Sequence, residues 1–302
     1  MKFAVCCIIS KNYLAHARTA LKSFAKFHQN FESHVLILDD WKDYFDESQE
    51  SFKSYSVADI GVSTDQYCRI LHKHSVFQVS CIFKSCFVRF LLKKQGVQRL
   101  LYLDADIFFL SSITDTLEKL RTNNLVLTPH LLNRDPYQSE ELIRLEAQTN
   151  AAGVFNMGFF GISKSRESFE FLDWWWRRVL TYCERDVPSG LFDDQKWIDA
   201  VPAMFEGVSV ARDPGYNVAN WNLHERDLTL LGGKYFAGRR KLAFFHFSKF
   251  RPDQAYRLSS YSLVDTRRHV ALKNLCASYV TELKRNGWEQ TSKWPFSLIH
   301  EI

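Results

Sequence analysis

Two aspartates lie in the middle of a long apolar stretch. Residues 100–110 read LLYLDADIFFL, with Asp104 and Asp106 separated by one alanine. A continuous apolar run of this kind is typical of a strand that is buried on both faces of a sheet. Because ionised carboxylates are costly to bury without a compensating charge, the pair indicates a cation inside the domain or at the floor of a cleft.

The spacing of these two carboxylates suits a shared ion. In a regular strand, Asp104 and Asp106 would point to the same face and reach one ligand together. Oxygen ligands suit Mg²⁺ or Mn²⁺, and Mg²⁺ is often shared between one or two carboxylates and the phosphates of a substrate. The alternative is structural: one aspartate caps the following turn and the other pairs with an arginine. The spacing alone leaves both open, because short Asp-x-Asp matches also arise by chance.

The first part of the chain predicts the opening of an α/β sheet that would position this pair. Its pattern indicates a short buried strand at 3–9, an amphipathic helix at 13–27 and a second strand at 34–40. A helix is also expected at 75–94, and residues 41–55 read as a polar surface connection. Neither GxGxxG after the first strand nor GxxxxGK[ST] occurs, which disfavours dinucleotide dehydrogenases and P-loop proteins.

Polar side chains follow the first two predicted strands. Ser10 and Asn12 come after the first strand, and Asp39 and Asp40 after the second. Ligands collect at the carboxyl ends of parallel strands, so these residues are candidates for contact with one, although ordinary turn chemistry also explains them.

Two cations interrupt the apolar pattern of the predicted helix at 75–94. Lys84 falls on its apolar face, and Arg89 raises the same question. Each would either extend its charge away from an apolar surface or reach a phosphate or ribose across the sheet.

The second half of the chain carries further candidates. An apolar strand at 154–162 contains Asn156 and Gly158, Asp194 and Gln195 begin a short helix at 196–200, and a strand at 241–247 contains His246. A glycine in a strand often marks the close approach of a ligand or backbone, and a buried asparagine needs hydrogen-bond partners. The other elements expected here are helices at 115–121, 139–148 and 169–183, a strand at 124–130 and a polar aromatic loop at 213–222.

Composition bounds the class of protein. The 302 residues are 46% hydrophobic and 15% aromatic, which is enough for a sizeable core. The net charge of +5 is compatible with phosphate-bearing substrates or an anionic membrane surface, and it is too small to indicate nucleic acid. Seven scattered cysteines without a CxxC pair indicate a reducing compartment. With no apolar run approaching the roughly 20 residues of a membrane helix, and only 3–9 as an N-terminal apolar run, we expect a cytoplasmic protein.

Four motifs together resemble a known family. YLDADI at 102–107, FNMGFFGI at 155–162, DDQKW at 193–197 and FHFSKFRP at 245–252 are similar to nucleotide-sugar glycosyltransferases of the GT-A fold, above all family 8 and its bacterial relatives. The resemblance covers 1–255. It implies a Rossmann-like α/β fold with a mixed, mostly parallel sheet, a nucleotide-binding half at 1–110 and a sugar and acceptor half at 111–255.

The resemblance also implies a reaction. Family members transfer a sugar from a nucleotide diphosphate sugar, most often a UDP-sugar, with a divalent metal that is usually Mn²⁺ and with retention of configuration. The implied acceptor is a glycan or a lipid-linked acceptor in bacterial surface polysaccharide or lipooligosaccharide synthesis. An inverting relative, in which Asp194 serves as a base, is not excluded by the sequence.

Carried over by position, the resemblance assigns roles. Asp104 would lie near the ribose and the metal, and Asp106 and His246 would ligate the metal. Asn156 and Gly158 would line the sugar site.

Asp194 and Gln195 would face the transferred sugar and the acceptor. One departure concerns the segment after the histidine, where the family usually has a glycine and then a Lys-Pro pair. Here Lys249 stands at the glycine position and Arg251 precedes the proline one residue early; either cation would neutralise the diphosphate.

Two other functions share some of these features. A sugar-nucleotide nucleotidyltransferase would also bind metal through aspartates, but it usually carries a glycine-rich basic loop after the first strand, which Ser10 to Tyr13 does not provide. A non-catalytic glycan-binding or scaffold protein would be expected to lack metal ligands, and here all three are present.

The last segment, 256–302, is expected to form a basic helical extension. Its terminal aromatic and apolar side chains are Trp288, Trp294, Phe296 and Ile299. They would either seat the protein on an anionic membrane surface or pack back on the domain. The sequence indicates no oligomeric state.

Overall fold

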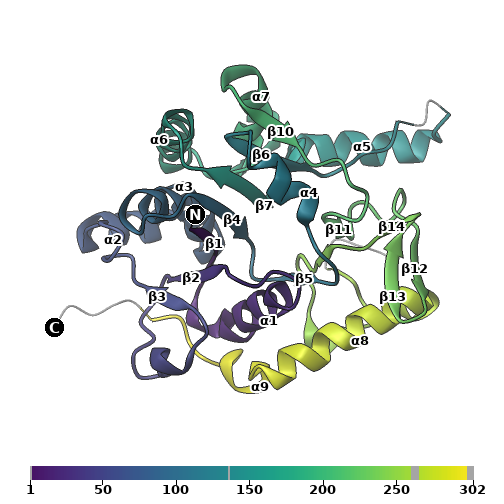
Figure 1. The fold of residues 1–302 in the computed structure, drawn as a ribbon, viewed down its shortest axis with the longest axis horizontal. Coiled ribbons are helices and arrows are strands. Elements are labelled where there is room, and N and C mark those ends of the chain that lie inside the picture. The colour runs from purple at the N-terminus through teal and green to yellow at the C-terminus, as the bar shows by residue number, and fades with distance from the viewer. Residues whose placement is uncertain (1, 135–136, 260–264, 298–302) are drawn as a thin grey trace.

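A seven-stranded sheet forms the centre of the molecule (Figure 1). The computed structural model describes residues 2–134, 137–259 and 265–297. In spatial order the strands are β10 (Val208–Val210), β6 (Leu125–Pro129), β7 (Phe155–Ser163), β4 (Arg99–Leu103), β1 (Phe3–Ile9), β2 (Glu32–Ile37) and β3 (Lys53–Tyr55). Only β7 runs against its neighbours, which confirms the predicted mixed, mostly parallel sheet.

Helices cover both faces of this sheet. On one face, α3 (Val76–Lys94) packs with α6 (Arg166–Thr181), and on the other lies α1 (Leu14–Ala25). Alternate residues of β1 point to opposite layers, so Cys6 joins the core beneath α3 and Cys7 the core beneath α1. Strand β1 has the predicted bounds, and α3 begins one residue after its predicted start because Ser75 and Gln78 form a capping box.

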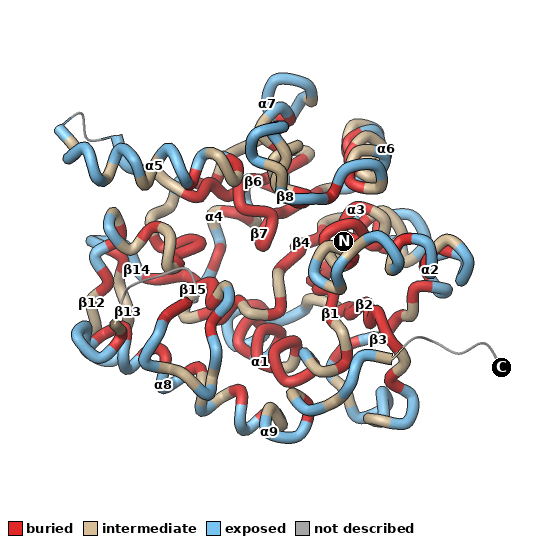
Figure 2. Tube along the Cα trace, turned by 180° about the vertical axis from the view of Figure 1, so that it is seen from behind, coloured by how far each residue is buried: buried red, intermediate tan, exposed pale blue. Residues whose placement is uncertain are grey.

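The remaining elements surround these layers. The helices are α2 (Thr64–Lys73), α4 (Thr114–Lys119), α5 (Glu140–Ala152), α7 (Val201–Met204), α8 (Val270–Arg285) and α9 (Trp288–Thr291). The short 3-10 turns are Lys11–Tyr13, Glu47–Gln49, Val187–Ser189, Lys196–Ala200, Pro252–Gln254 and Thr266–Arg268. Two hairpin sheets contain β8 (Arg185–Asp186) with β9 (Leu191–Phe192), and β12 (Leu228–Leu231) with β13 (Lys234–Ala237) and β14 (Arg240–Lys241). Figure 2 shows that β4 and β7 are buried, whereas α5 is exposed along most of its length.

The predicted strand at 100–110 is not continuous, and this corrects the sequence analysis. It breaks at the two aspartates into β4 and β5 (Ile107–Phe109). β5 leaves the main sheet and joins a second sheet with β15 (Phe244–His246) and β11 (Val218–Ala219). The aspartates therefore lie in a turn between two sheets, and their proximity does not come from the period of one strand.

The C-terminal segment packs back on the domain. Leu272, Leu275 and Tyr279 of α8 are buried in a third core cluster, and Trp288 packs against the same cluster. Trp294 packs against the core beneath α1. Both tryptophans thus face the protein, while Ile299 lies outside the described residues. In the described part of the chain, no helix combines the length and apolar character needed to cross a bilayer.

Candidate metal and donor site

Backbone hydrogen bonds bring three distant segments together around the aspartate turn. The amide of Ile107 donates to the carbonyl of Asp104 (3.1 Å) and closes the turn. The amide of Asp104 donates to the carbonyl of Gly158 in β7 (2.7 Å), and that of Phe247, just after β15, donates to the carbonyl of Asp106 (2.9 Å). The break between β4 and β5 at the aspartates therefore lets β4, β7 and β15 meet at the aspartate turn.

Asp104, Asp106 and His246 form a candidate metal cluster at this point. One ligand atom from each lies within 4.8 Å of the others. Nε2 of His246 is 3.0 Å from Oδ1 of Asp106 and 3.9 Å from Oδ2 of Asp104. The carboxylates are partly exposed whereas His246 is buried, so the cluster opens to solvent on the aspartate side.

The cluster fits a divalent ion. Oδ1 of Asp106 is buried, and Nε2 of His246, 3.0 Å away, can donate a hydrogen bond to it only when the imidazole carries a proton on that nitrogen. Two carboxylates and one imidazole are a ligand set that suits Mn²⁺ and other first-row divalent ions. A divalent cation would supply a counter-charge to this buried carboxylate oxygen when the imidazole is neutral, because a buried carboxylate needs one.

Gly158 lies directly against the cluster, and its lack of a side chain lets its neighbours pack close to the strand. A Cβ atom at this position would lie 2.4 Å from Cε1 of His246, 2.8 Å from Oδ1 of Asn156 and 2.9 Å from Oδ2 of Asp104. All three distances are shorter than a van der Waals contact, so only glycine fits here without displacing its neighbours.

Charge coupling within the cluster shifts two pKa values in opposite directions. Burial by itself would lower the pKa of His246, but the charges of Asp106 and Asp104 outweigh burial and raise it. Burial by itself would raise the pKa of Asp106, but the charge of His246 and the bond to it lower it. A metal ion would replace the proton as the cation that these carboxylates hold.

Lys84 connects the cluster to Asp194. Its Nζ lies 3.1 Å from Oδ2 of Asp194 and 3.5 Å from Oδ1 of Asp104, and it donates to the carbonyl of Met157 (3.1 Å). The side chain is buried, so Lys84 does not extend its charge from an apolar surface into solvent. Its contact with a phosphate or ribose stays a prediction. Burial opposes the charged form, yet the two carboxylates raise the pKa of Lys84. Burial also raises the pKa of Asp194, against the effect of Lys84.

Asn156 is oriented by hydrogen bonds on both sides. Nδ1 of His130 lies 2.8 Å from the carbonyl of Gly153, so this nitrogen carries the proton and Nε2 is an acceptor. The Nδ2 group of Asn156 faces that Nε2 at 3.2 Å, and its Oδ1 accepts from the amide of Gly158 (3.2 Å). Burial lowers the pKa of His130 to about 4, so its ring stays neutral near pH 7.

Gln195 lies at the edge of this region. Its Nε2 donates to the carbonyl of Ala152 (2.9 Å), at the end of α5. The carbonyl of Asp194 accepts from the indole of Trp175 (3.1 Å), which fixes the chain just before Gln195. Asp194 is thus tied to the cluster through Lys84, whereas the amide of Gln195 is engaged with α5.

The carboxyl ends of β1 and β2 form a separate polar group. The amide of Lys11 donates to Oδ1 of Asp39 (2.7 Å), and its buried Nζ pairs with Oδ2 of Asp39 (3.1 Å). Nζ also donates to the hydroxyl of Ser297 (2.5 Å). Ser10 donates to Oδ1 of Asn12 (2.5 Å). Asp39 therefore has an internal partner in Lys11, which the sequence analysis did not single out.

Three predicted cations have other partners. Arg89 pairs with Asp173 of α6 (2.6 Å), within the helix layer. Arg251 is exposed and pairs with Asp253 (2.8 Å). Nζ of Lys249 lies 4.5 Å from the centre of the Phe77 ring, at the start of α3. The structure does not bring these side chains to the metal cluster.

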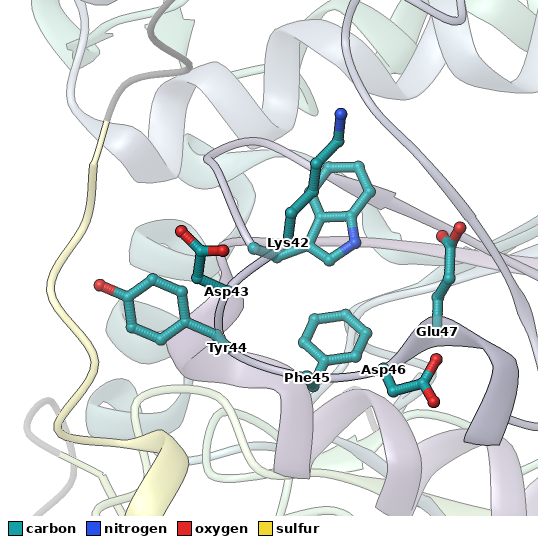
Figure 3. Close-up of a pocket in the computed structure, with 7 residues that line it drawn as sticks. Lys42, Asp43, Tyr44, Phe45, Asp46 and Glu47 are labelled. Atoms are coloured by element: carbon teal, nitrogen blue, oxygen red, sulfur yellow. The ribbon is translucent and has the colours of Figure 1, made fainter.

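A surface hollow lies away from this cluster. It has a volume of about 560 Å³ and is lined by the seven consecutive residues from Trp41 to Glu47 (Figure 3). These residues follow β2, and none of them belongs to the Asp104, Asp106 and His246 cluster. The candidate metal ligands therefore do not line this hollow.

Sequence reasoning left two neighbours of the cluster without a role. Asn217 contacts His246, and His130 contacts Asn156. Both contacts join residues at least 26 positions apart. The sequence placed Asn217 in the polar loop at 213–222, which predicted a binding region. It did not predict that Asn217 contacts His246.

Two proteins of Bacillus subtilis are similar to this chain in sequence. The chain is 28% identical over 199 residues to the uncharacterized protein YfnD of Bacillus subtilis strain 168, covering 64% of this chain and 60% of YfnD. It is 22% identical over 253 residues to the uncharacterized protein YfnF of the same strain, covering 83% and 82%.

Solved structures share the fold. The galactosyltransferase LgtC, in complex with donor and acceptor sugar analogues, matches with a TM-score of 0.51 at 15% identity and covers 94% of this chain and 96% of LgtC. The glycosyltransferase GlyE of Streptococcus pneumoniae TIGR4 matches with a TM-score of 0.53 at 16% identity, covering 100% of this chain and 67% of GlyE. These similarities support the predicted GT-A fold.

The sequence profile described as "Glycosyl transferase family 8" matches residues 4–166, more than half of the chain. This range includes β1, the aspartate turn and β7, which carry three of the site segments described above. The chain therefore belongs to glycosyl transferase family 8.

Proposed function

We propose that this protein is a metal-dependent glycosyltransferase that moves a sugar from a nucleotide diphosphate sugar to a glycan or lipid-linked acceptor. The observation that carries the proposal is the Asp104, Asp106 and His246 cluster, with Lys84 and Asn156 beside it. LgtC is a galactosyltransferase and its structure contains donor and acceptor sugar analogues, which supports a hexose donor for this chain. We propose a UDP-sugar donor and Mn²⁺ or Mg²⁺ as the ion.

In this proposal, one set of residues binds the leaving nucleoside diphosphate and another binds the sugar. A bound divalent ion supplies positive charge where the departing nucleoside diphosphate becomes negative. Asp106, His246 and Asp104 would hold that ion, and Asp104 would also lie near the ribose. Lys84 keeps its charge because two carboxylates surround it, so it holds Asp104 and Asp194 in fixed positions.

The sugar side is formed by β7 and the loop before the 3-10 turn at Lys196–Ala200. Gly158 lets the side chains of His246, Asn156 and Asp104 lie close against β7, and it would line the sugar site with Asn156, whose amide is oriented by His130. Asp194 would face the sugar, whose carbon becomes cation-like. We propose retention of configuration, as the family resemblance implies. Ser10 and Asn12, with Asp39, would meet the nucleoside.

The setting of the reaction is a further part of the proposal. The expected acceptors belong to bacterial surface polysaccharide or lipooligosaccharide synthesis, and the protein would act in the cytoplasm. Trp288 and Trp294 pack inward, so contact with the inner face of the membrane would come from the basic residues of the C-terminal segment and from the exposed ring of Phe296.

The proposal is tested by nucleotide release. The protein is incubated with Mn²⁺ and a panel of UDP-, GDP-, CDP- and dTDP-sugars without a glycan acceptor, so that water takes the sugar, and the nucleoside diphosphate released by this hydrolysis is measured with and without EDTA. We expect release from one nucleotide class that depends on metal and is lost in Asp106→Asn. The matched control is Asp115→Asn, which changes an aspartate of α4 paired with Lys119 on the surface. Release that persists in EDTA and in Asp106→Asn would refute the metal-dependent mechanism.

A further inference from the structure

Asn217 lies directly behind the metal-facing histidine. Its Oδ1 is 3.3 Å from Nδ1 of His246, and its side chain is completely buried. The other ring nitrogen of His246, Nε2, is the atom that lies 3.0 Å from Asp106. Asn217 and the carboxylates therefore contact opposite sides of the same imidazole.

The backbone holds Asn217 in this place. Its φ angle of 52° is in the left-handed region, which asparagine tolerates better than most residues. Its carbonyl accepts from Nδ2 of Asn222 (2.9 Å), whose Oδ1 accepts from the amide of Ala219 (2.9 Å). Ala219 in turn pairs with His246 in the β11–β15 ladder. The position of Asn217 relative to His246 is thus set by both strand pairing and side-chain bonds.

The group that Asn217 presents decides which nitrogen of His246 can bind an ion. A neutral imidazole binds metal through the nitrogen that carries no proton, and a hydrogen bond to the other nitrogen selects that form. With Oδ1 facing it, Nδ1 keeps its proton and donates it, so the lone pair of Nε2 points toward the carboxylates. With the amide rotated, the NH₂ group would face Nδ1 and force the proton onto Nε2, which would block the ion.

An unsatisfied atom supports this reading of Asn217. Its Nδ2 is buried and has no hydrogen-bond partner among the described residues. A buried donor without an acceptor destabilises a protein by about 1–3 kcal/mol. A purely structural asparagine would be expected to satisfy both ends of its amide, whereas the contact with His246 uses only the oxygen.

We propose that Asn217 is a positioning residue that fixes the tautomer and orientation of His246 so that Nε2 binds the divalent ion. The inference rests on the proposed function, because it takes His246 as a metal ligand. Asn217 does not touch the ion or the donor in this account. It acts only through the imidazole.

Two substitutions separate the side-chain oxygen from the backbone. Asn217→Gly keeps a residue that tolerates the left-handed conformation and removes the oxygen. Asn217→Asp keeps an oxygen in the same place. A matched control is Asn30→Gly, because Asn30 also has a positive φ angle (75°) but is exposed in the loop between α1 and β2.

The first readout is Mn²⁺ binding to the protein without donor, measured by electron paramagnetic resonance. We expect Asn217→Gly to weaken Mn²⁺ binding roughly 10–100-fold, the usual effect of removing a partner of a metal-ligating histidine. Asn217→Asp should recover most of the affinity, and Asn30→Gly should leave it unchanged. Equal affinity in Asn217→Gly and wild type would overturn the proposal.

The second readout is the ring of His246 in metal-free protein at pH 9, followed by ¹⁵N spectroscopy with His246→Gln for assignment. Wild type should carry the proton on Nδ1, and Asn217→Gly should shift toward the other tautomer. An unchanged tautomer in Asn217→Gly would contradict the inference. Should this variant fail to fold, Asn217→Asp decides: the wild-type tautomer and affinity would support the inference, and loss of either would overturn it.

Asp106→Asn distinguishes this inference from the proposed function. If Mn²⁺ binding is unchanged in Asp106→Asn, the metal site itself is wrong and the inference falls with it. If Asp106→Asn abolishes Mn²⁺ binding while Asn217→Gly binds like wild type, the metal site stands and only the role of Asn217 is refuted.

Discussion

Single atoms at Gly158 decide whether the metal cluster can form. Gly158→Ala would place a methyl group 2.4 Å from the His246 ring, which is enclosed and cannot swing away easily. We expect Mn²⁺ binding to weaken at least tenfold and metal-dependent activity to fall with it, while the protein remains folded. The measurement is Mn²⁺ affinity by calorimetry, with folding followed by circular dichroism.

Gly161 on the same strand provides the matched control. In Gly161→Ala the new Cβ atom would lie 2.7 Å from Cδ1 of Leu120. This atom is the end of a flexible side chain in the core beneath α1. Overpacking of this kind costs about 1–3 kcal/mol of stability, and Mn²⁺ affinity should be unchanged. If both alanine variants bind Mn²⁺ equally, the close fit at Gly158 does not matter for the site.

The charge of Lys84 is the second prediction at this scale. Lys84→Met would leave the buried carboxylate of Asp194 without its partner. Removing one member of a buried ion pair typically destabilises a protein by about 3–5 kcal/mol. The control is Lys119→Met, which removes a half-exposed pair with Asp115 and should change stability by about 0–1 kcal/mol. Urea unfolding compares the two, and equal losses would show that the Lys84 pairs are not buried as described.

At the scale of elements, the sequence predicted the helices and strands whose structure depends mainly on local residue pattern. β1 and α3 have clear periods and, for α3, a capping box, so their bounds were predictable. The break at Asp104 to Asp106 was not, because apolar residues continue on both sides. Long-range pairing of β5 with β15 produces it. The contacts of Asn217 and His130 depend in the same way on which loops the fold brings together.

The pairing of β2 and β3 gives a prediction about pH. His34 of β2 is buried against the hydroxyl of Tyr55 in β3 (3.0 Å), and burial lowers the pKa of His34 to about 4. In the unfolded chain the pKa of a histidine is about 6.5. The unfolded state therefore binds more protons between these two values, so the folded state loses stability as the pH falls through this window.

His34→Leu isolates this effect, since other titrating groups cancel in the comparison. Between pH 6.5 and pH 4, wild type should lose stability relative to the variant by about 1.4 kcal/mol per pH unit. Unfolding free energies from urea titrations at several pH values measure the difference. A difference that stays constant with pH would show that His34 is not held neutral in the folded state.

At the scale of the whole molecule, a segment late in the sequence packs against loops that follow the first two strands. Residues 293–297 run to the carboxyl ends of β1 and β2, where the carbonyl of Ser297 accepts from the amide of Asp40 (3.1 Å). The ring of Trp294 lies 5.3 Å from that of Tyr44. Figure 1 shows the C-terminal segment passing from α9 toward β2 and β3. The segment therefore packs against the domain that contains the central sheet.

Removal of residues 293–302 tests this arrangement. Loss of the half-buried Trp294 alone should cost about 1 kcal/mol, and a loss of this size lowers Tm by about 2–4 °C in a domain of 150–250 residues. Removal of only 298–302 retains the contacts of Trp294 and Ser297 and serves as the control. Thermal unfolding of both truncated proteins gives the answer. Equal Tm values would mean that 293–297 adds no stability.

The central claim is that the Asp104, Asp106 and His246 cluster binds the metal that holds a nucleoside diphosphate. The most direct measurement is calorimetric titration of UDP into the protein, in Mn²⁺ and in EDTA, for wild type and Asp106→Asn. The account predicts binding to wild type in Mn²⁺ and a loss of at least tenfold in affinity both in EDTA and in Asp106→Asn. Binding of UDP with equal affinity in all of these conditions would contradict it.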